Sequence, residues 1–128
     1  MSELELTSPW GNQEILLDDG KCKVKKITVH PGARLSYQSH EKRAEIWVII
    51  SGTGKVTLDE HESLVGPNAV MGVPVNAKHR IENILADEDL VFIETQIGTY
   101  FGEDDIIRFD DDYGRHQDNW ADVDADLL

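Results

Sequence analysis

Four side chains that can bind a metal ion lie in two short stretches of the sequence. Gln38 and His40 are two residues apart, so on a strand both point to the same face. Glu45 follows across a short turn, and His79 opens a later strand. A carboxylate, two imidazoles and an amide oxygen suit a borderline divalent ion such as Zn²⁺, Mn²⁺, Ni²⁺ or Fe²⁺. Spacing alone also allows the ordinary interpretation, in which each histidine is a surface or hydrogen-bonding residue.

These four residues need rigid elements to hold them together. The residue pattern in the middle of the chain predicts that these elements are strands. Short runs of β-branched and aromatic residues are separated by Gly, Pro, Asn and Asp. Because no amphipathic helix is long enough to cover a parallel sheet, the pattern favours a sandwich or barrel. The expected strands span residues 22–29, 35–40, 45–50, 54–58, 62–65, 69–73, 79–83 and 90–96.

Length and composition limit the chain to one domain. With 128 residues, 40% of them hydrophobic and 29% charged, it is long enough for one core and too short for two. We expect one all-β domain over residues 1–115. Residues 100–115 should form a loop or short helical turn over the barrel. Residues 116–128 should form an acidic tail that is part of the domain or partly disordered.

The charge argues against nucleic acid and membranes as partners. The 12 Lys and Arg residues face 25 Asp and Glu residues, which gives a net charge of -13. Ten of the acidic residues fall between residues 103 and 128, a segment that we interpret as solvating. A single cysteine excludes an intrachain disulfide, and residues 1–9 lack the features of a signal peptide. The sequence therefore indicates a soluble cytoplasmic protein.

Two segments resemble a known superfamily. PGARLSYQSHEKRAEIWVIISG, residues 31–52, and PVNAKHRIEN, residues 74–83, are similar to the two signature motifs of the cupins. The resemblance implies a double-stranded β-helix, or jelly-roll barrel, that holds one divalent metal ion. It also implies that Gln38, His40, Glu45 and His79 are the ligands. Gln38 departs from the usual pattern because most cupins have a histidine there.

The Gln-x-His pair resembles the metal site of mannose-6-phosphate isomerases. Other segments are similar to the type II isomerase domain, which is also found fused behind mannose-1-phosphate guanylyltransferases; one is GEDDIIRFDDDYGR, residues 102–115. The resemblance implies metal-dependent interconversion of mannose 6-phosphate and fructose 6-phosphate. Zinc is the first expectation for the metal, and Mn, Co, Ni or Fe are alternatives.

Departures from the family leave a second function open. The family usually has histidine where this chain has Glu41, Lys42 and Ile46. The alternative is a non-catalytic cupin that binds a sugar or sugar phosphate. A third interpretation keeps the metal but changes the chemistry to that of cupin dioxygenases. Because barrel edges need protection, we also expect a homodimer.

An isomerase acting on a sugar phosphate needs an anchor for the phosphate group. The fork of donors on arginine suits phosphate. The candidate anchors are Lys25, Arg43, Arg108 and Arg115. Arg43 has the parity of Glu45, so it faces the metal if its strand extends that far, whereas Arg80 should point away from His79. Each arginine can instead be a surface ion-pair partner.

The reaction also needs a base that moves a proton between C1 and C2. Glu94 is the candidate, because a carboxyl group on the apolar wall of a barrel has a raised pKa. Lys25, Lys42 and a metal-bound hydroxide are alternatives. We therefore expect Glu94 and Arg43 to be the catalytic residues.

Overall fold

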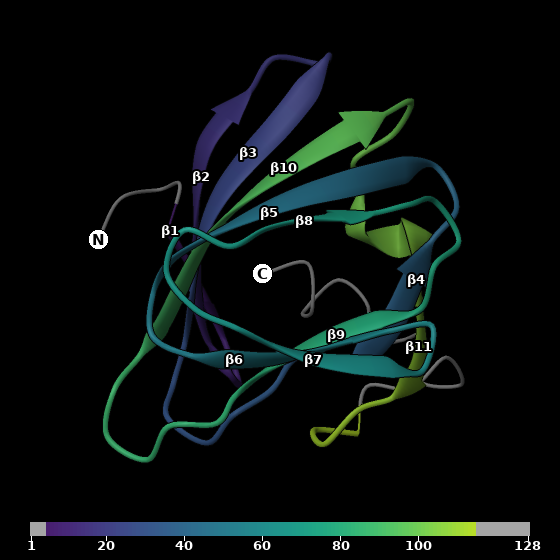
Figure 1. Ribbon diagram of the computed structural model, residues 1–128. Helices are drawn as coiled ribbons and strands as arrows, with labels where there is room; N and C mark the ends of the chain where they lie inside the picture. The colour runs from purple at the N-terminus through teal and green to yellow at the C-terminus, as the bar shows by residue number, and fades with distance from the viewer. Residues whose placement is uncertain (1–4, 115–128) are drawn as a thin grey trace.

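A computed structural model describes residues 5–114, more than half of which lie in strands (Figure 1). The only helical element within this range is a 3-10 turn, η1 (Glu103–Asp105). The strands are β1 (Glu5–Ser8), β2 (Gly11–Asp18), β3 (Cys22–Val29), β4 (Tyr37–His40), β5 (Arg43–Ser51), β6 (Gly54–Leu58), β7 (His61–Val65), β8 (Val70–Val73), β9 (His79–Asn83), β10 (Leu90–Gly98) and β11 (Ile106–Asp110). The all-β expectation is confirmed, and the described residues contain no helix long and apolar enough to cross a bilayer.

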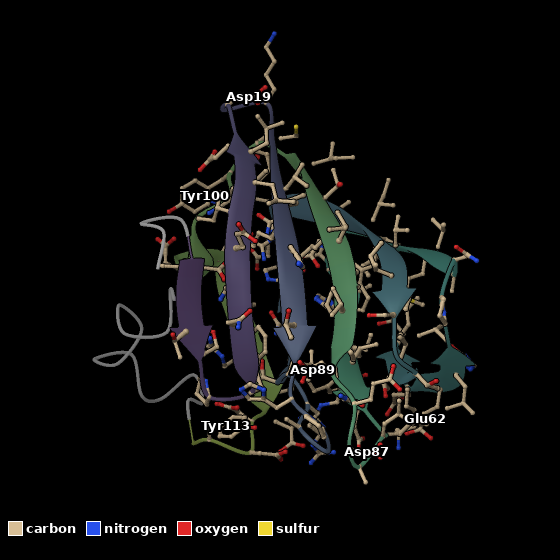
Figure 2. The ribbon with its side chains drawn as sticks, turned by 90° about the vertical axis from the view of Figure 1, so that its left-hand side faces the viewer. Asp19, Glu62, Asp87, Asp89, Tyr100 and Tyr113 are labelled. Atoms are coloured by element: carbon tan, nitrogen blue, oxygen red, sulfur yellow. The ribbon has the colours of Figure 1, made fainter. Side chains whose placement is uncertain are left out.

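Two antiparallel sheets face each other. The six-stranded sheet has the order β1-β2-β3-β10-β5-β8, and the five-stranded sheet has the order β11-β4-β9-β6-β7. Figure 2 looks onto the outer face of the six-stranded sheet. Strands distant in sequence are neighbours in both sheets, as in a jelly roll. Alternate side chains point between the sheets. The largest apolar ones there are Trp10, Ile27, Trp47, Ile49, Ile81, Leu90 and Phe92.

Three strands were missed by the sequence-based interpretation. β2 begins with Gly-Asn-Gln-Glu, residue types with little intrinsic preference for strands. It takes its conformation from pairing with β3, where Asn12 lies opposite Thr28. β1 pairs in turn with β2. Residues 100–115 were expected to lack a strand, and this was wrong for β11, which pairs with β4. The expected helical turn is present as η1.

The acidic segment that begins at Glu103 is partly built into the barrel. Its interpretation as a solvating tail was wrong for Glu103 and for the buried Asp111, whereas Asp104, Asp110 and Asp112 are exposed. The Glu103 side chain is 12% exposed and forms ion pairs with two buried cations. The Asp112 carboxylate accepts hydrogen bonds of 2.7 and 2.8 Å from Arg34. These basic partners are distant in the sequence, which composition does not show. The expected tail, residues 116–128, lies outside the described residues.

Candidate functional site

Three buried side chains of metal-binding type meet between the two sheets. His40, Glu45 and His79 each offer one ligand atom, and these atoms lie within 4.8 Å of one another. Their residues are only 2–3% exposed. His40 and His79 come from β4 and β9 of the five-stranded sheet, and Glu45 comes from β5 of the opposite sheet. The cluster therefore forms only when the barrel closes.

His79 is held in a form that can bind a cation. Its Nδ1 atom lies 3.0 Å from the carbonyl oxygen of Ala77. Because a carbonyl only accepts hydrogen bonds, Nδ1 carries the proton and Nε2 keeps its lone pair. That Nε2 atom lies 3.9 Å from Oε1 of Glu45. The backbone thus fixes both the tautomer and the direction of the ring.

His40 contacts both Glu45 and Arg43. The Nη2 atom of Arg43 lies 2.9 Å from His40 Nε2, and since a guanidinium only donates, Nε2 is the acceptor. The Nδ1 atom lies 3.6 Å from Oε2 of Glu45. Burial lowers the pKa of His40 to about 3, so the ring is neutral at physiological pH. An ion bound through Nε2 would require Arg43 to release this contact.

The Glu45 carboxylate is oriented by two donors. Arg43 Nε donates to Oε2 at 3.0 Å, and Trp47 Nε1 donates to Oε1 at 2.9 Å. Burial by itself would raise the pKa of Glu45, but the Arg43 guanidinium, the two neighbouring histidines and a hydrogen bond with Glu94 together outweigh it and hold the pKa below its usual range. One ionised carboxylate and two imidazoles are a donor set that fits a borderline divalent ion.

Gln38, the fourth predicted ligand, lies next to this cluster. It is opposite His79 in the β4–β9 pair and lines the same cavity. Its amide nitrogen donates to Ser36 Oγ at 3.0 Å. The amide oxygen is therefore the atom left for a ligand, as the sequence interpretation requires.

Two buried cations share one carboxylate beside the cluster. The Nη1 atom of Arg43 lies 2.9 Å from Oε2 of Glu103, and Lys25 Nζ lies 3.6 Å from Oε1. Lys25 also donates to Gln13 Oε1 at 2.8 Å. Burial would raise the pKa of Glu103, but Lys25 and Arg43 lower it to about 2. Lys25 and Arg43, two of the four predicted anchors, therefore lie in the site, and each contacts Glu103, a residue that sequence reasoning missed.

Glu94 faces the same cavity from β10. Burial, followed by the negative charge of Glu45, raises the pKa of Glu94 to about 8. Gln96 Nε2 donates to its Oε2 atom at 2.7 Å. A carboxyl group that is largely protonated at neutral pH and becomes a strong base on ionisation is suited to proton transfer.

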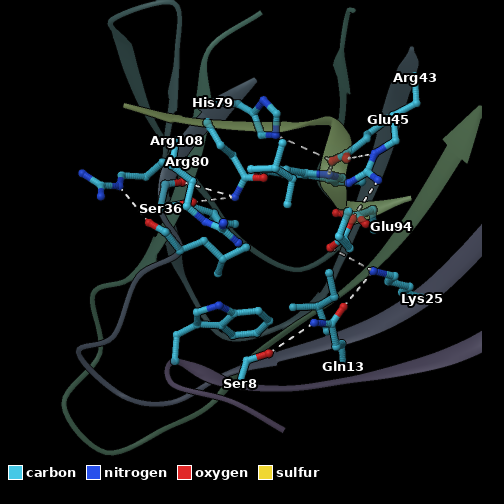
Figure 3. Close-up of a pocket in the computed structure, with 18 residues that line it drawn as sticks. Ser8, Gln13, Lys25, Ser36, Arg43, Glu45, His79, Arg80, Glu94 and Arg108 are labelled. Carbon is cyan, nitrogen blue, oxygen red and sulfur yellow. Dashed lines mark hydrogen bonds and ion pairs between the residues drawn. The ribbon is translucent and has the colours of Figure 1, made fainter. Parts of the chain in front are cut away.

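The remaining predicted residues are less closely grouped. Arg108 lines the cavity from β11, where it lies opposite Gln38. Arg80 donates to Asp110 at 3.0 Å and to the carbonyl of Leu35 at 2.9 Å. Arg115 lies outside the described residues. Figure 3 shows the side chains that converge on the cavity, which include Lys25, Arg43, Glu45, His79 and Glu94.

Solved structures with the same fold identify the class of protein. The cupin domain of Cnp3 from Schizosaccharomyces pombe has a TM-score of 0.65 at 17% identity and covers 68% of this chain and 64% of that chain. The capsular polysaccharide assembling protein CapF from Staphylococcus aureus has a TM-score of 0.72 at 21% identity over 84% of this chain and 34% of that chain. The chain therefore has the cupin fold, and it carries a candidate site for a divalent metal ion.

Sequence comparison identifies the family within that class. Residues 2–111 match the family described as mannose-6-phosphate isomerase C-terminal, and the chain belongs to it. It is 46% identical over 114 residues to the alginate biosynthesis protein AlgA of Pseudomonas putida. It is 43% identical over 111 residues to the mannose-1-phosphate guanylyltransferase of Escherichia coli K12. These matches cover 89% and 87% of this chain but only 23% of each relative.

Proposed function

We propose that this protein is a metal-dependent isomerase that interconverts mannose 6-phosphate and fructose 6-phosphate. The observation that carries the proposal is the buried cluster of His40, Glu45 and His79 beside Glu94. Membership of the mannose-6-phosphate isomerase C-terminal family supports the choice of substrate. Aldose-ketose isomerisation needs a Lewis acid, a group that transfers a proton and an anchor for phosphate. The cavity offers a candidate for each.

The chain's own residues prepare the site for this chemistry. A divalent ion bound by His40, Glu45, His79 and the amide oxygen of Gln38 would polarise the substrate's carbonyl or hydroxyl oxygen. Arg43 and the Trp47 indole hold the Glu45 carboxylate in one orientation. This leaves that carboxylate ionised and directed into the cavity.

Glu94 is the proposed proton carrier. In its ionised form it removes the proton from C2 of the aldose and returns it to C1, while a second proton passes from O2 to O1. Its raised pKa makes the carboxylate a stronger base than an exposed glutamate. Lys25 and Arg43 supply the positive charge for the phosphate.

The positions that depart from the family do not weaken the proposal. Ile46 is 42% exposed. Because it directly follows Glu45 on β5, its side chain points to the opposite face of the sheet. Glu41 and Lys42 are exposed in the turn between β4 and β5. Because none of the three lines the cavity, their substitution removes no group from it. This favours catalysis over the alternative of a non-catalytic sugar-binding cupin.

A coupled assay of mannose 6-phosphate isomerisation tests the proposal. The purified protein is stripped of metal and then supplied separately with Zn²⁺, Mn²⁺, Co²⁺ or Ni²⁺. We expect turnover that depends on the added metal and is lost in His40→Ala. Stoichiometric metal binding without turnover for any metal would overturn the isomerase proposal and favour a sugar-binding protein.

A further inference from the structure

The Glu103 carboxylate occupies a position that suits an anionic ligand. Its two oxygens face the Arg43 guanidinium at 2.9 Å and the Lys25 ammonium at 3.6 Å. Both cations are almost completely buried, with 3% and 2% of their side chains exposed. Arginine and lysine together are a common pair for binding phosphate. Glu103 therefore occupies the ammonium of Lys25 and the guanidinium of Arg43, the two groups that an incoming phosphate would need.

The cavity is too small for a sugar phosphate in this conformation. Its volume is about 40 Å³. A single water molecule needs roughly 10–15 Å³, whereas pockets that hold small organic ligands have volumes of roughly 300–1,000 Å³. Part of the wall must therefore move before a hexose phosphate can enter.

Glu103 belongs to a segment that is attached to the barrel by the Glu103 ion pairs, by a 3.5 Å hydrogen bond from Arg43 Nη1 to the Phe101 carbonyl, and by surface contacts. We call residues 99–105, between β10 and β11, the strap. The Thr99 amide donates to the carbonyl of Lys42 at 3.0 Å. The Asp105 carboxylate accepts from the amides of Glu41 and Lys42 at 3.3 and 3.0 Å. Because these contacts with the β4–β5 turn are exposed, the strap can open at lower cost than a buried strand.

We propose that Glu103 is an internal occupant of an anion subsite formed by Lys25 and Arg43, and that the phosphate group of the substrate displaces it as the strap moves outward. The identity of the anion as a sugar phosphate rests on the proposed function. With Glu103 in place, a phosphate would meet a negative charge. Once Glu103 has left, the phosphate meets two cations.

The proposal predicts that wild-type affinity for phosphate is reduced by the cost of displacing Glu103. Inorganic phosphate is the probe, and calorimetry on the full, metal-loaded chain is the measurement. We expect Glu103→Gln to bind phosphate at least about 10-fold more tightly than the wild type. Adding Lys25→Met to this variant should abolish the gain.

Asp104→Asn is the matched control. Asp104 is the next residue in η1, is exposed and bonds to Tyr100 rather than to the two cations. It removes the same charge, so its affinity for phosphate should stay within about 2-fold of the wild type. An equal gain in Asp104→Asn, or unchanged or weaker binding in Glu103→Gln, would overturn the proposal. The same holds if neither the wild type nor Glu103→Gln binds phosphate.

Hydrogen exchange on the wild type tests the movement without a variant. Saturating phosphate should speed exchange of the Glu41 and Lys42 amides several-fold relative to chloride at equal ionic strength, because Asp105 releases them. Unchanged or slower exchange contradicts the outward movement. Both measurements are independent of turnover. Tighter binding without turnover would sink only the isomerase proposal, and turnover without tighter binding would sink only the displacement.

Discussion

The Nη2 atom of the Arg43 guanidinium lies 2.9 Å from the Nε2 atom of His40. The same group donates to Glu45 from Nε at 3.0 Å and to Glu103 from Nη1 at 2.9 Å. One side chain thus links the candidate metal cluster to the candidate anion subsite. This explains why a cation is buried here, since each of its nitrogen atoms has a partner.

Arg43→Lys should therefore damage catalysis more than charge conservation suggests. A lysine ammonium cannot reach His40, Glu45 and Glu103 together, because it lacks the planar fork of arginine. We expect kcat/KM for mannose 6-phosphate to fall at least about 100-fold. Arg34→Lys is the control, because Arg34 pairs with Asp112 outside the cavity. Equal activity in Arg43→Lys and the control would show that Arg43 acts only as a general positive charge.

His79→Ala should weaken metal binding. The variant removes an imidazole whose Nε2 lone pair is directed at Glu45 by the Ala77 carbonyl. We expect the Kd for Zn²⁺ to rise at least about 100-fold in a chelator competition assay. His61→Ala is the control, since His61 lies exposed on β7. Wild-type protein saturated with Zn²⁺ at about 100 times its Kd should gain about 2.7 kcal/mol of stability, and His79→Ala should gain almost none. If His61→Ala loses as much affinity as His79→Ala, the ion binds elsewhere.

The candidate ligands could be predicted because their signals are local. Gln38 and His40 share the parity of one strand, and the predicted strand that begins at His79 has the same bounds as β9. The parity argument also placed Arg43 correctly on the side of Glu45, because β5 begins at Arg43. The role of these residues as metal ligands stays a prediction.

Glu103 could not be predicted because its partners are distant in sequence. It lies 60 residues from Arg43, and the ion pair forms only after β10 has crossed the sheet. In the sequence it is one of ten acidic residues near the end of the chain. Composition therefore assigns it to solvent. Its position in the segment GEDD, residues 102–105, was the available signal, but this segment does not indicate that Lys25 and Arg43 are its partners.

Glu103→Gln should change how stability depends on pH. The pKa of Glu103 is lowered from its ordinary value of 4.5 to about 2 in the folded protein, where burial is outweighed by Lys25 and Arg43. A lowered folded-state pKa means that the carboxylate stabilises the protein fully above pH 4.5 and loses this contribution as the pH falls toward 2. The shift corresponds to about 3 kcal/mol at neutral pH. Urea unfolding at pH 7 and pH 3 provides the measurement.

We expect Glu103→Gln to be less stable than the wild type by about 3 kcal/mol at pH 7 and by clearly less at pH 3. Comparing the two proteins cancels the titration of the other carboxyl groups. A difference that does not change between these pH values would show that Glu103 stabilises by packing. The phosphate experiment and this one together ask whether the same ion pairs that stabilise the fold also oppose the ligand.

Gly98, at the end of β10, and Gly102, in the strap, should differ sharply in their tolerance of alanine. A Cβ atom on Gly98 would lie 2.2 Å from the Lys42 carbonyl oxygen and 2.7 Å from Arg43 Cα, both in the backbone of the neighbouring chain segment. A Cβ atom on Gly102 would lie 2.1 Å from the Tyr100 hydroxyl, the far end of an exposed side chain. The first contact requires the end of β10 to separate from β5, whereas the second requires only a rotation of Tyr100. We expect Gly98→Ala to cost about 2–4 kcal/mol of unfolding free energy and to lower isomerase activity through displaced Arg43. Gly102→Ala should cost less than about 1 kcal/mol. Urea unfolding of both variants measures this difference, and equal costs would contradict the close approach of Gly98 to Arg43.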